Sequence, residues 1–201
     1  MAGGGAGAHQ PLPAGDFATW LREMRAALRG ERSADVPCGD CTACCTASQF
    51  VHIGPDEADT IAHIPVALLF PAPRMPRGHL LLGYDERGHC PMLVDGVCSI
   101  YEHRPRTCRT YDCRIFAATG ISADDTGVDT DKALIADRVA RWEFAYPTAR
   151  DRDLHAAVQA SAAAVRVEDG QRPPGAPPHT AIQLAVRAVE LSEEEAASGE
   201  S

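Results

Sequence analysis

The sequence has few aromatic residues and a deficit of positive charge. Aromatic residues make up 5% of the 201 residues, so we expect the core to rest on Ala, Val, Leu and Ile. Lys and Arg together number 19 against 28 Asp and Glu, which gives a formal net charge of −9. Nucleic acids and anionic membranes bind broad basic surfaces. We therefore expect no general nucleic-acid binding and no membrane binding.

A membrane-targeting pattern is also missing. No stretch approaches the roughly 20 apolar residues that cross a bilayer. Residues 1–15 lack the basic start and the apolar run of a secretory signal. We therefore expect a cytoplasmic protein, in which thiols stay reduced. Its eight cysteines then favour metal or redox chemistry over structural disulfides.

The chain is long enough for one domain of ordinary size with tails. Residues 1–15, rich in Gly, Ala and Pro, are expected to form a disordered arm. Residues 16–170 are predicted to form a cysteine-cluster metal-binding domain with flanking helices, and its motif core spans 38–114. The remaining residues, 171–201, are expected to hold a Pro-rich linker, a last helix over Thr180–Leu191 and a mobile acidic end.

Hydrophobic spacing predicts several further helices, with Asp16 as the cap of the first. They are Phe17–Arg29, a helix that opens at Gly54–Glu57, a short one within Arg104–Phe116, Asp131–Tyr146 and Arg152–Val167.

Short strands joined by turns are expected in the middle of the chain. They are Gln49–Ile53, Leu80–Tyr84, His89–Val94 and Val97–Tyr101, with turns at Asp85–Gly88 and Asp95–Gly96 and a Pro-broken loop over Pro65–Pro76. Asp-Gly between apolar runs is a strong hairpin signal. The predicted fold class is α+β and mostly helical, with a small irregular cysteine-rich metal-binding knuckle and a short β-hairpin packed against helices.

All eight cysteines lie between positions 38 and 113, in two clusters of four along the sequence. They are Cys38, Cys41, Cys44 and Cys45, followed by Cys90, Cys98, Cys108 and Cys113. A C-x-x-C unit in a turn can aim two sulfurs at one ion, and the first cluster contains two such units that overlap. We interpret all eight as metal ligands, with a redox dithiol system or incidental core cysteines as the alternatives.

Cys44 and Cys45 pose a coordination problem. Neighbouring side chains point in divergent directions, so the two would rarely bind one tetrahedral ion together. One of them joins the second cluster, bridges two metals or stays free, and the sequence leaves these alternatives open. An interleaved arrangement, with ligands drawn from both clusters, follows naturally.

The metal is expected to be zinc or iron, because both accept four thiolates. Several arginines are threaded between the last cysteines and can donate N–H···S contacts to thiolates. They are Arg104, Arg106, Arg109 and Arg114. Ion pairs with surface carboxylates are the equal alternative for them. His89 and His103 can replace a thiolate, but with eight cysteines present a surface imidazole is the favoured interpretation.

Two sequence signatures carry a resemblance to a known family. Cys38-x-x-Cys41-x-x-Cys44-Cys45 resembles the CxxCxxCC signature of the YkgJ-type cysteine-cluster family of zinc- or iron-chelating proteins. The later segment is similar to the family's second signature, and reads Cys90-Pro-Met-Leu93, then Gly96-Val-Cys98-Ser-Ile-Tyr101-Glu-His-Arg104-Pro105-Arg-Thr-Cys108-Arg109. The resemblance implies a ligand role for the seven cysteines in these motifs, and Cys113 fits a frequent downstream cysteine.

The resemblance implies metal chelation without a defined reaction. A related cysteine cluster occurs in the bacterial flagellin lysine N-methylase, but no glycine-rich loop after a strand suggests a nucleotide or S-adenosylmethionine site here. The predicted function is therefore zinc or iron chelation, a [4Fe–4S] cluster included, with the specific activity and any catalytic residues open. The alternatives are an iron–sulfur enzyme or electron carrier that modifies another protein, and a metal or redox sensor or delivery protein. A metal ion is the expected partner, and a protein partner is a further alternative.

Overall fold

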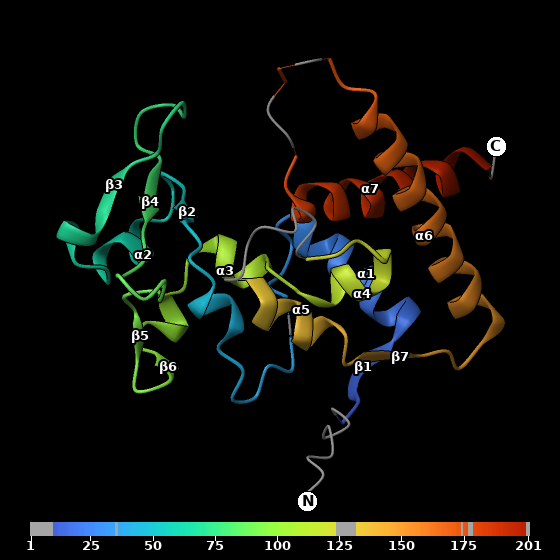
Figure 1. Cartoon of the computed structure of the whole chain (residues 1–201), viewed down its shortest axis with the longest axis horizontal. Coiled ribbons are helices and arrows are strands. Elements are labelled where there is room, and N and C mark those ends of the chain that lie inside the picture. The colour runs from blue at the N-terminus through green and yellow to red at the C-terminus, as the bar shows by residue number, and fades with distance from the viewer. Residues whose placement is uncertain (1–9, 35, 124–131, 174, 177–178, 200–201) are drawn as a thin grey trace, which may run out of the picture.

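The structure is a computed structural model that describes residues 10–34, 36–123, 132–173, 175–176 and 179–199. It contains a helical lobe and a smaller lobe of short strands, with the cysteine-bearing segments between them (Figure 1). The helices are α1 (Phe17–Leu28), α2 (Ala58–Ala62), α3 (Arg106–Thr110), α4 (Arg114–Thr119), α5 (Ala133–Val139), α6 (Ala149–Gly170) and α7 (Ala181–Gly199), with 3₁₀ turns η1 (Ala43–Thr46), η2 (Val66–Leu68) and η3 (Tyr101–His103). The strands are β1 (Leu12–Asp16), β2 (Val51–Ile53), β3 (Leu69–Pro71), β4 (Leu80–Leu82), β5 (Leu93–Val94), β6 (Val97–Cys98) and β7 (Trp142–Ala145).

The helical lobe is built around α1, α4, α6 and α7, which enclose the larger core. The apolar residues of α1 recur at helical spacing, so Phe17, Trp20 and Leu21 share the buried face. Along α7, Ala185 and Val189 are fully buried in the same core. The α+β, mostly helical fold class is confirmed, as are the helices expected at α1 and α6.

A parallel strand pair, β1 with β7, closes one end of the helical lobe. Leu12 pairs with Trp142, and Asp16 pairs with Ala145. Two expectations are therefore wrong. Residues 12–15 form a strand rather than part of a disordered arm, and the helix expected over Asp131–Tyr146 ends at Val139. Residues 1–9 and 124–131 lie outside the described part of the chain.

The aromatic residues of β7 explain why a strand replaces the end of that helix. Trp142, Phe144 and Tyr146 alternate with exposed residues at a period of two, which is strand spacing. The ring of Phe144 lies 5.0 Å from those of both Phe17 and Trp20, measured between centroids. Contacts with α1 thus override the helical pattern.

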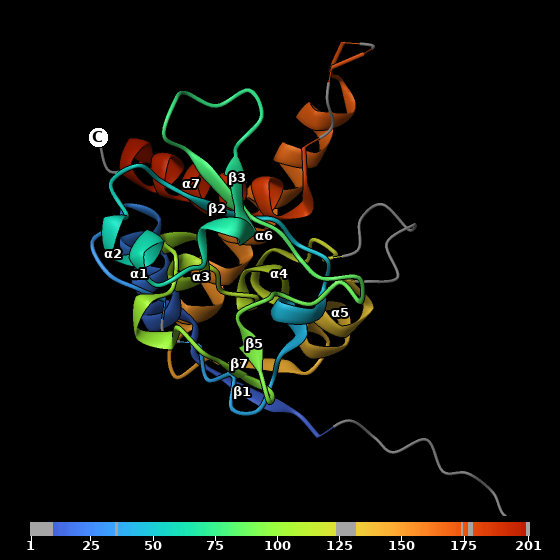
Figure 2. The ribbon, with the colours of Figure 1, turned by 90° about the vertical axis from the view of Figure 1, so that its left-hand side faces the viewer.

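In the small lobe, β4 lies between β2 and β3 in an antiparallel sheet. Two expectations are therefore wrong. The strand expected over Leu80–Tyr84 pairs with β2 and β3 and not with residues 89–94. The Pro65–Pro76 segment, expected to be a loop, contains β3. The Asp95–Gly96 hairpin between β5 and β6 is confirmed. Both turn residues have positive φ, 51° and 79°, as a type I′ turn requires. A second, smaller core beneath these strands contains Ile53, Leu82 and Ile100. Figure 2 views this lobe from its own side.

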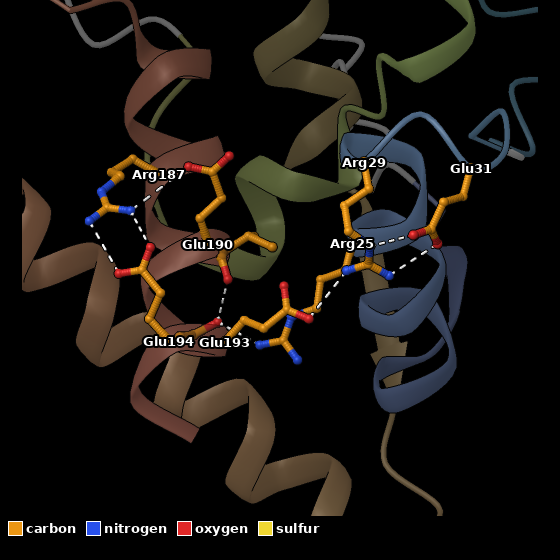
Figure 3. Close-up of polar contacts among 9 residues, drawn as sticks. Arg25, Arg29, Glu31, Arg187, Glu190, Glu193 and Glu194 are labelled. Carbon is orange, nitrogen blue, oxygen red and sulfur yellow. Dashed lines mark hydrogen bonds and ion pairs between the residues drawn. The ribbon is translucent and has the colours of Figure 1, made fainter. Parts of the chain in front are cut away.

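Helix α7 continues to Gly199, so the expectation of a mobile end from Ser192 onward is wrong for the described residues. Ion pairs and hydrogen bonds hold this last part against the end of α1 (Figure 3). Arg25 donates to the Ser192 hydroxyl at 3.0 Å, and Arg29 pairs with Glu193 at 3.2 Å. Glu193 of the expected acidic tail thus pairs with arginines at the end of α1, and Glu194 pairs with Arg187 of α7 itself. No described helix combines the length and apolar character that a membrane crossing requires.

Asp151 links the starts of two helices. Its carboxylate accepts the Thr148 N–H at 3.0 Å, which together with the Thr148 hydroxyl makes a capping box at the start of α6. Its second oxygen accepts the Ala18 N–H in the first turn of α1 at 3.0 Å. Asp16 occupies the N-cap position of α1, but its side chain makes no capping bond. The prediction of an Asp16 cap is therefore wrong, because a residue distant in sequence supplies that acceptor.

We expect Thr148→Ala to lower the free energy of unfolding by about 1 kcal/mol, the usual effect of a lost N-cap. Hydrogen bonds from the Thr148 hydroxyl and the Ala18 N–H hold the pKa of Asp151 below its ordinary value. This contribution to stability is present above the ordinary carboxyl pKa and is lost as the pH falls through the lowered value. Asp151→Asn should be less stable at neutral pH and should lose less in acid. Urea unfolding across pH measures both, and an unchanged acid profile in Asp151→Asn would contradict the double cap.

Candidate metal centre

The cysteines lie on segments that run between the two lobes. Cys38 and Cys41 are in the loop before η1, Cys44 and Cys45 are in η1, Cys90 precedes β5, Cys98 ends β6, Cys108 is in α3 and Cys113 occupies the N-cap position of α4. All eight are free thiols, and Cys113 is the one classed as buried while the others are half-buried. Desolvated free thiols without disulfide partners are consistent with a ligand role.

The 3₁₀ conformation of η1 separates Cys44 from Cys45. A 3₁₀ helix has three residues per turn, so consecutive side chains diverge by about 120°. The two neighbouring sulfurs therefore face different surroundings. On one side, Cys41 and Cys113 pack with the core of the helical lobe. On the other, Cys90 and Cys98 pack with the core of the small lobe.

Four thiols gather on the helical side, and we call them the helical-side group. They are Cys38, Cys41, Cys44 and Cys113. Burial raises the pKa of Cys44 far above its ordinary value, and the adjacent Cys45 and all three other members of this group raise it further. Burial likewise raises the pKa of Cys113 to about 11, with Cys38 and Cys41 adding to the rise. The sulfurs are thus close enough to repel one another as thiolates.

The other four thiols gather beside the hairpin, and we call them the sheet-side group. They are Cys45, Cys90, Cys98 and Cys108. Burial raises the pKa of Cys108 to about 12, and all three other members add to the rise. Burial also raises the pKa of Cys45 to about 11, and Cys90 and Cys98 contribute more to it than Cys38 and Cys41 do. Apart from its neighbour Cys44, Cys45 therefore interacts most with the sheet-side group.

Backbone contacts support the sheet-side group independently of charge. The Cys90 N–H donates to the Cys45 carbonyl at 2.7 Å, which joins the η1 segment to the segment before β5. Cys98 pairs with Leu93 across the β5–β6 hairpin. Thr107 donates its hydroxyl to the His52 carbonyl at 2.8 Å and so holds α3, which carries Cys108, against β2. Segments far apart in sequence thus present these four cysteines to one region.

Helix α5 and strand β7 close over the helical-side group. The Trp142 indole N–H donates to the Cys113 sulfur at 3.2 Å and opposes the burial that raises its pKa. Arg138 donates to the carbonyls of Pro37 and Cys38 at 3.0 and 3.1 Å. Trp142 and Arg138 were missed by sequence reasoning, since neither lies within a cysteine motif. The period-two aromatic spacing at 142–146 is the signal that could have placed the tryptophan.

Asp112 anchors the segment that carries Cys113. It is 2% exposed and accepts the Trp20 indole N–H of α1 at 2.9 Å. The Arg114 guanidinium contacts the same carboxylate at 2.8 Å and donates to the Ala14 carbonyl of β1 at 3.1 Å. A buried, hydrogen-bonded ion pair therefore fixes the start of α4 against α1 and β1.

The arginines between the last cysteines divide into two kinds. Arg104 opposes the burial and the neighbouring sulfurs that raise the pKa of Cys108, but its Nε–H donates to the Tyr101 carbonyl at 2.7 Å. The other three contact carboxylates. Arg106 pairs with the surface residue Asp56, as the alternative held, whereas Arg109 and Arg114 pair with the buried carboxylates of Glu57 and Asp112.

The histidines next to the cysteines contact other groups. The His103 ring lies against Asp59, with 2.8 Å between Nδ1 and Oδ2. The backbone N–H of His89 donates to the Asp85 carboxylate at 2.9 Å.

The sulfur spacing is wider than a closed zinc site needs. Among the described residues, no three cysteines place their sulfurs within 4.8 Å of one another. Zn–S bonds of about 2.3 Å would put the sulfurs of a tetrahedral site about 3.8 Å apart. The donor set of four thiols on each side fits zinc or iron, but the loops must draw inward to close around a single zinc ion.

Two cavities lie away from these sulfurs. The larger, about 460 Å³, is lined by residues of α1, α6 and α7, Arg22, Arg25 and Arg150 among them. The smaller, about 220 Å³, lies beside α3. No cysteine lines either cavity. Neither of them is therefore a substrate pocket over the sulfurs.

Comparison with known families agrees with this region of the chain. Residues 37–131 match the family model described as "CxxCxxCC: Putative zinc- or iron-chelating domain". Over these residues the chain is similar to this family of chelating domains. The resemblance found in the sequence motifs is thus confirmed, and the matched residues include all eight cysteines. No curated protein and no solved structure matches the chain.

Proposed function

We propose that the CxxCxxCC domain holds two interleaved four-thiolate metal centres, one in the helical-side group and one in the sheet-side group. The observation that carries this proposal is the division of Cys44 and Cys45 between the two groups. Each group draws one member of this pair, and each draws at least one cysteine from the later part of the sequence. Zinc or iron chelation is the function that the family describes, and the assignment of individual ligands is our own.

The centres would join segments that have little else to hold them. The η1 loop and the hairpin segments contribute few residues to either hydrophobic core. The sheet-side centre would join four segments and the helical-side centre would join two, and structural sites of this kind contribute directly to folding. Four thiols in each group suit either an iron–sulfur cluster or a zinc ion. No catalytic residue is assigned.

Anaerobic purification, followed by visible absorption and by elemental and sulfide analysis of one sample, tests this proposal. Iron with acid-labile sulfide and broad absorption near the blue would support two clusters. A colourless protein with about two zinc ions per chain would support closed zinc sites instead. A protein that holds neither metal, even after reconstitution, would overturn the proposal. All eight thiols are free, so we also propose that the protein works in a reducing compartment such as the cytoplasm.

Metal binding should release protons and should strengthen as the pH rises. Burial raises the pKa of Cys45 and Cys113 to about 11 and that of Cys108 to about 12, so these thiols are protonated at neutral pH without metal. Each must lose its proton to bind. Below those pKa values the affinity should change by about tenfold per pH unit for each thiol deprotonated. Chelator competition with zinc between pH 6 and pH 8 measures this dependence, and a flat profile would contradict thiolate ligation.

A further inference from the structure

A second constellation of metal-binding side chains lies in the small lobe, outside the cysteine groups. Asp59 of α2, His63 just after it and His103 at the end of η3 each place one ligand atom within 4.8 Å of the others. His103 Nδ1 is 2.8 Å from Asp59 Oδ2, and His63 Nδ1 is 3.8 Å from Asp59 Oδ1. The two imidazole rings stack with centroids 3.5 Å apart. Three ligands from two segments thus meet at one exposed spot.

The two segments that carry these ligands are fixed by a buried carboxylate. Glu57, 7% exposed, accepts the Gly54 N–H at 2.7 Å just before α2 and also accepts the Arg106 N–H at the start of α3. Beneath them, Ile64 and Ile100 are buried in the core of the small lobe. Each isoleucine lies close in sequence to one of the histidines. The backbone positions of the ligands are therefore set by packing that involves none of the ligands themselves.

We propose that Asp59, His63 and His103 bind a divalent transition-metal ion, with zinc as the best fit. Two imidazoles and one carboxylate are a donor set that zinc and its neighbours accept, with water in the remaining positions. The ion takes the place of the proton between His103 Nδ1 and Asp59, and the neutral His103 ring keeps its one N–H on Nε2. His63 Nδ1 lies 2.8 Å from the Asp59 backbone carbonyl. That contact breaks when the exposed His63 ring turns about its χ2 bond, so that the Nδ1 lone pairs of His63 and His103 converge on the ion.

This site is separate from the cysteine centres. His103 lies between Cys98 and Cys108 in sequence, yet its ring contacts Asp59, and no cysteine completes the group of three. The site remains open to solvent because Asp59 is 70% exposed and His63 is 41% exposed. Open coordination positions distinguish it from a closed four-thiolate site.

Equilibrium dialysis of the full-length, anaerobically purified protein against zinc, with elemental analysis, tests the site. We compare wild type with His63→Ala/His103→Ala and with Asp59→Asn. His79→Gln is the matched control, because His79 and His52 form a similar contact, 2.8 Å between ring nitrogens, and belong to no group of three among the described residues. Circular dichroism of each variant shows that the fold is retained.

We expect wild type and His79→Gln to bind about one zinc ion more than the histidine double variant, and Asp59→Asn to bind at least about tenfold more weakly. The difference in bound zinc between wild type and the double variant measures this site alone. The test therefore remains valid even if the cysteines hold no metal. Equal zinc binding by wild type and the double variant would overturn the proposal. An equal loss in His79→Gln would also overturn it, since it would show unspecific binding to surface histidines.

Discussion

Replacing Cys44 or Cys45 with serine should remove different metal centres although the two residues are adjacent. Cys44 belongs to the helical-side group and Cys45 to the sheet-side group. Each single variant should lose about half of the bound metal, because the other four-thiolate group is intact. Elemental analysis of anaerobically purified protein measures the loss.

Double variants sharpen this prediction. Cys44→Ser/Cys113→Ser removes two ligands from one group and should lose no more metal than Cys44→Ser alone. Cys44→Ser/Cys45→Ser removes one ligand from each group and should lose nearly all of it. Two results would contradict the interleaved assignment. One is an additive loss of metal in Cys44→Ser/Cys113→Ser, and the other is no further loss in Cys44→Ser/Cys45→Ser. Non-additivity of this kind identifies residues that act as one unit.

The same variants should be much less stable. The apparent free energy of zinc binding at a structural site can reach about 10 kcal/mol. The small apolar core near the cysteine-bearing segments is too limited to compensate for the loss of such a site. Thermal unfolding should therefore fall in parallel with metal content. A variant that loses half of its metal and keeps the wild-type melting curve would show that the centre serves chemistry and not folding.

Asp112→Ala should lower the free energy of unfolding by about 3–5 kcal/mol, because it removes one partner of a buried ion pair, the carboxylate to which the Arg114 guanidinium donates. Arg114 is 8% exposed. The substitution also removes the acceptor of the Trp20 indole N–H. Since Cys113 lies between the two charged residues, metal loss from the helical-side group should accompany the loss of stability. Urea unfolding and elemental analysis measure the two effects.

A double-variant cycle and a surface control separate this ion pair from general effects of charge. Asp112→Ala/Arg114→Ala should recover part of the lost stability, because the positive charge that Asp112 compensates is removed together with it. Asp56→Ala breaks the exposed pair with Arg106 and should lower the stability far less, because solvent screens exposed ion pairs. Equal losses in Asp56→Ala and Asp112→Ala would contradict the role of burial.

Features set by neighbouring residues could be predicted from the sequence. The apolar spacing of α1 and the alanine-rich composition of α6 predicted these two helices. The Asp95–Gly96 pair predicted the β5–β6 hairpin, whose positive φ angles these residues tolerate. The overlapping C-x-x-C units predicted a metal-chelating segment, which the family match confirms. In each case the signal lies within a few residues of the structure that it specifies.

Only the tertiary structure decided which distant residues meet. The pairing of β1 with β7 overrode a helical pattern because the aromatic side chains of β7 pack on α1. Asp151 caps α1 in place of Asp16, and Trp142 donates to Cys113, through contacts that no local spacing encodes. The division of the cysteines into two groups has the same origin. The sequence determined that eight thiols are present and that Cys44 and Cys45 diverge, whereas the packing of the two lobes decided which sulfurs each of them faces.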